Sequence, residues 1–242
     1  MEQGKLLGII GGMGSFATAQ FFNTVLDLTD AETDQEHLDI LIKNHASLPD
    51  RTNALIVGGR DILLETLVED ARQLEANGCD YIVMTCNTSH AFIEPMIAAV
   101  KTEFIHMIRE TAAYAAARFG TGANIGILAT NGCIAASLYQ TELDKLGLKC
   151  TVPDEKHQDT VMDIIYGQVK RTGIYNIDDF NGVVVEMDGK GCDAYILGCT
   201  ELSLIKARES LGDKFIDSSQ VLAIKCILNC GKKLKPGYFS EF

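Results

Sequence analysis

Two cysteines stand at matching places in the two halves of this 242-residue chain. Cys86 ends the apolar run that follows Gly78-Cys79-Asp80, and Cys199 ends the run that follows Gly191-Cys192-Asp193. Polar helix-capping residues follow both, so each thiol is expected at the start of a helix, where a thiolate is stabilised. Two thiols that face one small ligand could serve as the base and the acid of a proton transfer at one carbon atom.

The other cysteines offer less. Cys133 is a weaker candidate for chemistry, and four others are expected to pack as small buried side chains: Cys79, Cys192, Cys226 and Cys230. No two cysteines form a Cys-x-x-Cys pair, which argues against a structural zinc site. Eight cysteines in a chain without an export signal are expected to be reduced thiols, which favours a cytoplasmic protein.

Two further features suggest a site for an anionic ligand. Arg51 follows an expected strand end and can bind a carboxylate through two hydrogen bonds, although a solvated loop arginine is an equal alternative. The turn Gly12-Met13-Gly14 either belongs to a dinucleotide fingerprint or offers backbone amides to a carboxylate. We favour the second interpretation, because no acidic residue ends the second strand, where a dinucleotide ribose would need one.

The histidines follow no pattern that is typical of metal binding or of a catalytic triad. His90, four residues after Cys86, either orients the thiol region or lies on a helix surface. Structural roles are favoured for His37, His106 and His157. No lysine lies in a recognisable pyridoxal phosphate context. We therefore expect neither a metal nor an organic cofactor.

Apolar runs alternate with longer amphipathic segments, which predicts strands joined by crossover helices. Strands are expected at 5–10, 38–43, 81–85, 104–108, 124–129, 149–152, 193–197 and from 215 onward. Helices are expected at 16–28, 61–77, 89–101, 111–119, 134–146, 159–168, 177–190, 202–209 and 220–232. The candidate residues follow strand ends, which is where open parallel sheets bind ligands.

The order of elements repeats once along the chain. Residues 8–14 align with 126–132, the two cysteine runs align, and Phe104-Ile105-His106 aligns with Phe215-Ile216-Asp217. Three matches in the same order indicate an internal duplication.

From this repeat we predict an α/β protein with two similar, doubly wound parallel-sheet domains related by pseudo-twofold symmetry. Residues 1–110 and a returning segment, 214–242, would form the first domain, and residues 111–213 the second. The active site would lie in the cleft between them, with the two thiols on its opposite sides.

Composition narrows the choice of partners. The chain has 33 acidic and 21 basic residues and a net charge of −12, which argues against nucleic acid and against an anionic membrane surface. No apolar stretch approaches the roughly 18 residues that span a bilayer. A small molecule is the expected ligand.

These motifs resemble those of the aspartate/glutamate racemase family, most closely its aspartate racemase-like branch of amino-acid racemases. The matching segments are 11–14, 49–52, 86–90, 128–130 and 198–201. The resemblance covers nearly the whole chain. It implies two similar α/β domains with the active site between them, a homodimer, and no use of pyridoxal phosphate or metal.

The resemblance also assigns roles to residues. Cys86 and Cys199 would be the two acid/base thiols. The chain departs from the branch at Ser15, where proline is usual, and at Cys133, where threonine is common. The second departure lies near the expected pocket and bears on substrate preference.

The substrate-binding residues that the resemblance implies are Met13, Arg51, Asn87, Thr88, Thr130, Lys170 and Thr200. Arg51 would bind the distal carboxylate of an acidic amino acid, and Lys170 would share that task. Asn87, Thr88 and Thr200 would hold the α-carboxylate or the ammonium group.

The function expected from the residues and the resemblance is a 1,1-proton transfer that interconverts the L and D forms of aspartate, glutamate or both. Two alternatives remain open at this point. One is a related isomerase or decarboxylase, similar to maleate isomerase or arylmalonate decarboxylase. The other is a protein that binds a small dicarboxylate without turning it over.

Overall fold

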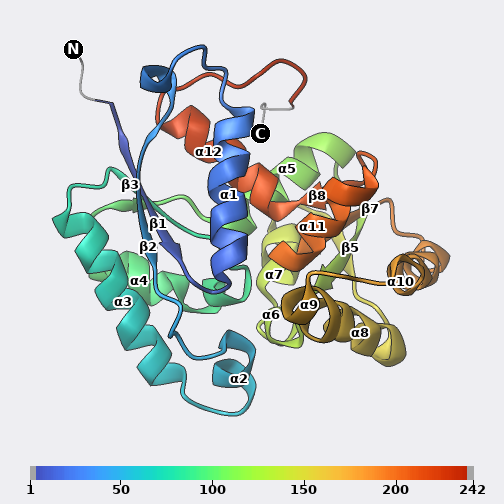
Figure 1. The fold of residues 1–242 in the computed structure, drawn as a ribbon. Coiled ribbons are helices and arrows are strands. Elements are labelled where there is room, and N and C mark those ends of the chain that lie inside the picture. Colours follow the sequence, from blue (N-terminus) through green and yellow to red (C-terminus); the bar gives the residue numbers. More distant parts are fainter. Residues whose placement is uncertain (1–3, 239–242) are drawn as a thin grey trace.

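The computed structural model describes residues 4–238, in which the strands form two parallel four-stranded sheets. The first sheet contains β1 (Leu6–Gly11), β2 (Asp39–Asn44), β3 (Tyr81–Met84) and β4 (Glu103–Phe104). The second contains β5 (Asn124–Ala129), β6 (Lys149–Thr151), β7 (Ala194–Gly198) and β8 (Phe215–Asp217). Their strand orders are β2-β1-β3-β4 and β6-β5-β7-β8 (Figure 1). The equal order confirms the expected α/β fold with two similar halves.

Helices cover both faces of each sheet (Figure 1). Those on the first sheet are α1 (Ser15–Leu28), α3 (Arg60–Ala76), α4 (Ile93–Ala99) and α12 (Ser218–Asn229). Those on the second are α5 (Met107–Phe119), α7 (Leu138–Lys145), α8 (Glu155–Met162), α10 (Ile177–Gly189) and α11 (Thr200–Glu209). No helix in the described range is long and apolar enough to cross a membrane.

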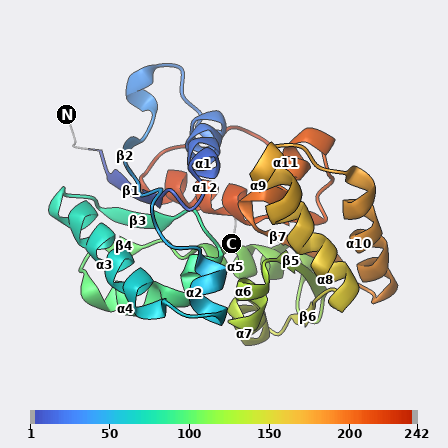
Figure 2. The same ribbon diagram turned by 60° about the horizontal axis from the view of Figure 1, so that its bottom comes forward.

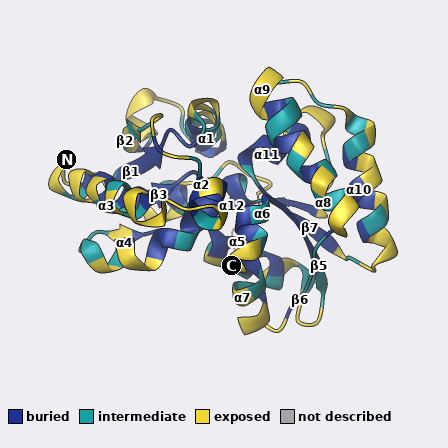
Figure 3. Ribbon diagram, turned by 90° about the horizontal axis from the view of Figure 1, so that it is seen from below, coloured by how far each residue is buried: buried dark blue, intermediate teal, exposed yellow. Residues whose placement is uncertain are grey.

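The central strands of both sheets are apolar because both of their faces are covered. All five residues of β7 are buried, as are Ile82, Val83 and Met84 of β3. Parallel strands covered by helices on both sides need such near-continuous apolar runs. Figure 3 shows the buried strands between helices whose outer faces are exposed.

Short helical segments lie at the strand ends where the two halves meet. They are α2 (Arg51–Ile56), the 3₁₀ segment η2 (Thr88–Phe92), α6 (Asn131–Ala135), the π-helix η3 (Asp163–Val169) and α9 (Lys170–Thr172). Another 3₁₀ turn, η1 (Asp34–Glu36), precedes β2. The helices α2 and α6 lie side by side across the two halves (Figure 2).

Several expected elements differ from those in the structure. The helix expected at 89–101 is the 3₁₀ segment η2 followed by the short α4, and the helix expected at 111–119 begins earlier, at Met107. The strand expected at 104–108 ends at Phe104, because the His106 side chain accepts a hydrogen bond from the Arg109 amide and starts α5. The helix expected at 134–146 is divided at Ser137, whose φ of 52° is left-handed. The helix expected at 159–168 begins earlier, as α8, and continues as a π-helix.

The returning segment serves both halves. Its strand β8 pairs with β7 in the second sheet, with Ile196 opposite Ile216. Its helix α12 packs on the first sheet, where Leu222 and Ile227 join the cluster that contains Ile9. The expected domain boundaries, 1–110 with 214–242 for the first domain and 111–213 for the second, therefore stay a prediction. The returning segment contributes its strand to the second half and its helix to the first.

Candidate active site

The residues expected in the site come together around one small cavity at the carboxyl ends of both sheets. Its lining is Met13, Arg51, Cys86, Asn87, Thr88, Thr130, Tyr166, Lys170, Cys199, Thr200 and Glu201. All nine residues that the sequence singled out are in this set. Tyr166 and Glu201 are additional.

Equivalent strands deliver the two thiols. Cys86 follows β3 and precedes η2, while Cys199 follows β7 and is the N-cap residue of α11. Because β3 and β7 are the third strands of two sheets with the same order, the thiols reach the cavity from opposite halves. Both cysteines are half-buried and free. Cys133, by contrast, is completely buried and outside the cavity lining.

The environment of Cys199 favours its protonated form. Burial raises the pKa of the Cys199 thiol well above its usual value, and the neighbouring carboxylate of Glu201 raises it further. The Cys199 thiol donates a hydrogen bond of 2.9 Å to Glu201 Oε2. The Lys170 ammonium acts in the opposite direction and lowers the pKa of Cys199.

Arg51 is a buried cation without an anionic partner in residues 4–238. It is only 8% exposed, and its Nη1 and Nη2 atoms donate to the carbonyl oxygens of Pro49 (3.0 Å) and Met13 (3.1 Å). Its buried Nε has no hydrogen-bond partner. A buried charge is costly unless a counter-ion neutralises it, so this guanidinium suits an anionic ligand.

The turn that holds Met13 against Arg51 depends on a glycine. Gly12 has a φ of +88°, and a Cβ atom there would lie 2.3 Å from the carbonyl carbon of His45. Only glycine fits a backbone that is both left-handed and this crowded. The same turn leads into α1, whose first residue, Ser15, accepts a hydrogen bond of 3.0 Å from Asn44 Nδ2.

Polar side chains join the halves next to the thiols. The hydroxyls of Thr88 and Thr130 lie 2.9 Å apart and come from opposite halves. The Asn87 side chain donates to Ser218 Oγ at 3.1 Å and accepts a hydrogen bond from the Tyr139 hydroxyl. Because the Asn87 side chain is engaged within the protein, its backbone is the part that remains for a ligand.

The π-helix η3 brings Tyr166 and Lys170 to the cavity. The Tyr166 hydroxyl reaches across to the first half and donates to Asp50 Oδ2 (3.1 Å) and Thr52 Oγ1 (3.3 Å). Lys170 Nζ lies 4.7 Å from the centre of the Tyr166 ring and 3.9 Å from Glu201 Oε1. A π-turn changes which residues share a helix face, so a regular helical pattern does not reveal Tyr166. Glu201 could have been found from its place two residues after Cys199.

A second hollow, of about 350 Å³, contains neither thiol. Its lining includes His90 and His106, whose rings lie 5.0 Å apart. Burial lowers the pKa of His90 to about 4 and that of His106 to about 2, so both are neutral near pH 7. His90 Nδ1 lies 2.9 Å from the carbonyl oxygen of Cys86. This contact holds the Cys86 backbone from the side of the second hollow, since His90 does not line the thiol cavity. Both thiols and both candidate cations line the first cavity and not this one.

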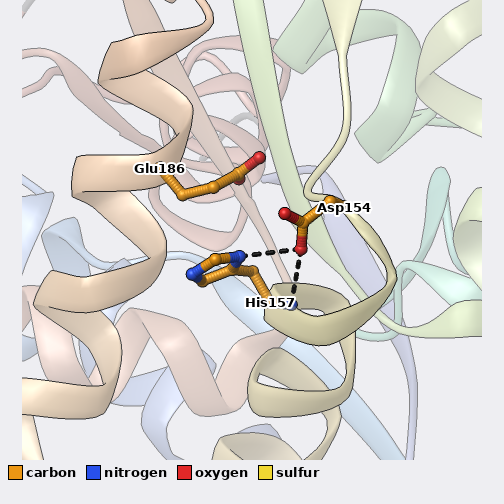
Figure 4. Close-up of side chains that lie close together, drawn as sticks. All are labelled: Asp154, His157 and Glu186. Atoms are coloured by element: carbon orange, nitrogen blue, oxygen red, sulfur yellow. Dashed lines mark hydrogen bonds and ion pairs between the residues drawn. The ribbon is translucent and has the colours of Figure 1, made fainter.

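Among residues 4–238, one group of side chains has ligand atoms close enough for a metal ion: Asp154, His157 and Glu186 (Figure 4). Asp154 accepts hydrogen bonds from the His157 amide (2.9 Å) and lies 2.7 Å from His157 Nδ1, which makes it the N-cap of α8. Glu186 is paired with Lys190, which also donates to a backbone carbonyl. These internal contacts account for the group, and none of its residues lines the thiol cavity.

Comparison with known proteins places these features in context. A family model described as "Asp/Glu/Hydantoin racemase" matches residues 10–226. The broad specificity amino-acid racemase RacX of Bacillus subtilis (strain 168) is 24% identical over 222 residues, which cover 90% of this chain and 95% of RacX.

Two solved structures have the same fold. The Picrophilus torridus aspartate racemase is 31% identical, with a TM-score of 0.82 and coverage of 96% of both chains. The glutamate racemase isoform RacE1 from Bacillus anthracis is 19% identical, with a TM-score of 0.69, and the match covers 96% of this chain and 83% of RacE1. At that identity the second likeness concerns the fold alone.

Proposed function

The chain belongs to the Asp/Glu/hydantoin racemase family, and we propose on this basis that it interconverts the L and D forms of an acidic amino acid, aspartate or glutamate, without a cofactor. The observation that carries the proposal is the meeting of Cys86, Cys199 and the unpaired Arg51 around one cavity. Two thiols from opposite halves supply a base and an acid, and the guanidinium supplies an anchor for a carboxylate.

The proposed reaction moves one proton at each face of Cα. A cysteine thiolate on one side takes the α-proton, so that the C–H bond breaks as an S–H bond forms. The thiol on the other side then gives its proton to the opposite face of the carbanion and becomes the thiolate. The reverse reaction uses the same pair with exchanged roles.

The weak acidity of the α-hydrogen is the main barrier. Charge that develops on the substrate carboxylate would be stabilised by the backbone amides at the start of α11, where Thr200 is the first helical residue, and by nearby cations. Burial of the cavity strengthens these interactions because it lowers the local dielectric constant. No metal or pyridine ring is needed in this scheme.

Arg51 and Lys170 support an acidic substrate. Arg51 carries a charge that no carboxylate in the described part of the chain neutralises, whereas Lys170 already lies near Glu201. A substrate with a second carboxylate would complete the charge balance of the cavity. An amino acid with an apolar side chain would leave Arg51 unpaired, so we propose that aspartate and glutamate are preferred.

Chiral chromatography after incubation with L-aspartate, L-glutamate and L-alanine tests the proposal. We expect the D form to accumulate from one or both acidic substrates and much more slowly from alanine. Cys86→Ala and Cys199→Ala should each abolish racemisation, while Cys192→Ala, which changes the repeated cysteine outside the cavity, should not.

Full activity in both cavity variants would contradict the two-thiol scheme. Turnover of maleate in place of amino acids would favour the related isomerases, and binding of acidic amino acids without turnover would indicate a non-catalytic protein. By family resemblance we also propose a homodimer in a reducing, cytoplasmic compartment. Sedimentation velocity tests the oligomeric state.

A further inference from the structure

Glu201 is a buried carboxylate inside the thiol cavity. It lies in the first turn of α11, two residues after Cys199, and is 9% exposed. It also faces the first half of the chain, since its Oε1 lies 3.8 Å from the position that a Cβ atom on Gly14 would take. The cavity therefore contains an acidic group of the protein as well as the cations that a dicarboxylate needs.

Three contacts hold this carboxylate against one of the two thiols. Glu201 Oε2 accepts hydrogen bonds from the Cys199 thiol (2.9 Å) and from the Thr200 hydroxyl (3.1 Å). Glu201 Oε1 lies 3.9 Å from Lys170 Nζ. The Thr200 bond and the Lys170 pair hold the carboxylate in the orientation in which Oε2 accepts the hydrogen bond from Cys199.

This geometry stabilises the thiol form of Cys199 and destabilises its thiolate form. The thiol donates its hydrogen to Glu201, whereas a thiolate would stand at the same distance from a like charge. The groups that face Cys199 are Glu201, Lys170 and Cys86, together with the hydroxyl of Tyr166. Among them Lys170 favours the thiolate, but it is shared with the carboxylate.

Cys86 has no such partner. Its thiol makes no hydrogen bond to a carboxylate within residues 4–238, and its neighbours after β3 are Asn87 and Thr88. The pseudosymmetric cavity is thus asymmetric in charge, with an acid beside one thiol and neutral residues beside the other.

We propose that Glu201 is a positioning residue that keeps Cys199 protonated in the free enzyme, so that Cys86 starts the reaction as the base and Cys199 as the acid. The role in catalysis rests on the proposed function. One turnover in this direction leaves Cys86 as a thiol and Cys199 as a thiolate next to Glu201. Exchange with solvent protons, or a turnover of the opposite enantiomer, restores the starting state.

A direct test measures the reactivity of Cys199 without any substrate. Iodoacetamide alkylates thiolates, so the rate of Cys199 modification against pH, followed by peptide mass spectrometry, gives its ionisation midpoint. We expect Glu201→Gln, which keeps the shape and removes the charge, to lower this midpoint by about one pH unit or more. Glu201→Asp, which keeps the negative charge, should leave the midpoint close to that of the parent protein. Glu209→Gln, at the exposed end of the same helix, should leave the midpoint unchanged.

The pH dependence of kcat/KM in the parent and in Glu201→Gln tests the same effect during turnover. The working enzyme holds one proton on its two thiols, so the alkaline limb of the kcat/KM profile reports loss of the Cys199 proton. We expect Glu201→Gln to move that limb to lower pH by a similar amount, while the acid limb moves less.

An unchanged Cys199 midpoint in correctly folded Glu201→Gln, as judged by circular dichroism, overturns the proposal. Equal shifts in Glu201→Gln and Glu201→Asp overturn it as well, because they would show a steric and not an electrostatic effect. Since alkylation needs no substrate, an inactive protein that shows the expected midpoints would contradict the racemase function and leave the role of Glu201 toward Cys199 intact.

Discussion

At the scale of single residues, Arg51 lowers the stability of the folded protein and favours the binding of an anion. It is a buried cation held by two backbone carbonyls and has no carboxylate partner in the described chain. Burying such a group lowers the free energy of unfolding, and an anion that binds to it raises that free energy again. This cost agrees with the role of anion anchor that we propose for Arg51.

Arg51→Met should therefore abolish activity on acidic amino acids without unfolding the protein. Loss of the buried charge offsets loss of the two hydrogen bonds, so we expect the Tm to stay within about 3 °C of the parent value. Succinate at 100 times its Kd should stabilise the parent by about 2.7 kcal/mol, and the variant by far less. Differential scanning fluorimetry with and without succinate measures both effects.

Arg171→Met provides the matched control, because Arg171 is exposed and outside the cavity. It should leave both the Tm and the response to succinate unchanged. Equal stabilisation of parent and Arg51→Met by succinate would refute the role of Arg51 as an anion anchor.

His90 makes a prediction about pH. Its pKa in the folded protein is lowered to about 4 from a usual value of 6.5, because burial disfavours the imidazolium. The unfolded chain then binds a proton that the folded chain does not. The stability that results is complete above about pH 6.5 and is lost as the pH falls toward 4, by about 3 kcal/mol in all.

Urea unfolding of the parent and of His90→Gln at pH 7, 5 and 4 measures this effect. The parent should lose more stability than the variant over that interval, so that the difference between them narrows or reverses at pH 4. A difference that is the same at pH 7 and pH 4 would contradict a neutral His90 in the folded state.

At the scale of elements, the π-helix and α2 form a bridge over the cavity. The Tyr166 hydroxyl donates to Asp50 and Thr52 across the two halves, and Lys170 follows immediately in α9. A bond of this kind contributes about 1 kcal/mol, which is roughly a fivefold effect on an equilibrium. The bridge therefore holds the cavity walls of the two halves together.

Tyr166→Phe should lower kcat/KM for the acidic substrate about fivefold, mainly by raising KM, because the cavity walls of the two halves are then held together less firmly. Steady-state kinetics with chiral detection measures the change. Tyr175→Phe removes a hydroxyl that bonds only to the surface residue Glu209, and it should have no effect. Unchanged kinetics in Tyr166→Phe would show that this bridge does not influence binding.

Some elements could be predicted from the sequence alone, and others could not. Strand 124–129 was predicted to the residue, since an apolar run between a turn and a polar segment has clear limits. The break at Ser137 and the π-turn at 163–169 were not, because both depend on contacts with distant segments. In the site, the repeat located both thiols, and the resemblance supplied the substrate-binding set. The sequence did not reveal that Asn87 is engaged by Tyr139 and Ser218, which follow it by 52 and 131 residues.

At the scale of the whole molecule, β8 and α12 tie the halves together. The strand belongs to the second sheet and the helix to the core of the first, while α5 contributes Met107 to the first core and Ile108 to the second. We expect the two halves to unfold in one transition, because neither core is complete without these elements.

Leu222→Ala tests this coupling. The side chain is fully buried in the first core, so its truncation should cost about 2–5 kcal/mol. Hydrogen exchange at rising urea concentrations should show peptides of both sheets losing protection together and at a lower concentration than in the parent. Leu228→Ala, on the exposed side of the same helix, should shift neither set. Separate midpoints for the two sheets would contradict the coupling.

The path of α12 has a consequence for the order of events during synthesis. Leu7, Ile9 and Phe21 leave the ribosome early, yet Leu222 and Ile227, which cover them, are translated after the whole second sheet. The part of the first core that α12 covers must therefore wait, exposed, while more than half of the chain is made, although α1 can cover the rest of that face early. Nascent chains expose such surfaces to chaperones and to one another, so slow translation of this protein carries a risk of aggregation that its finished structure does not show.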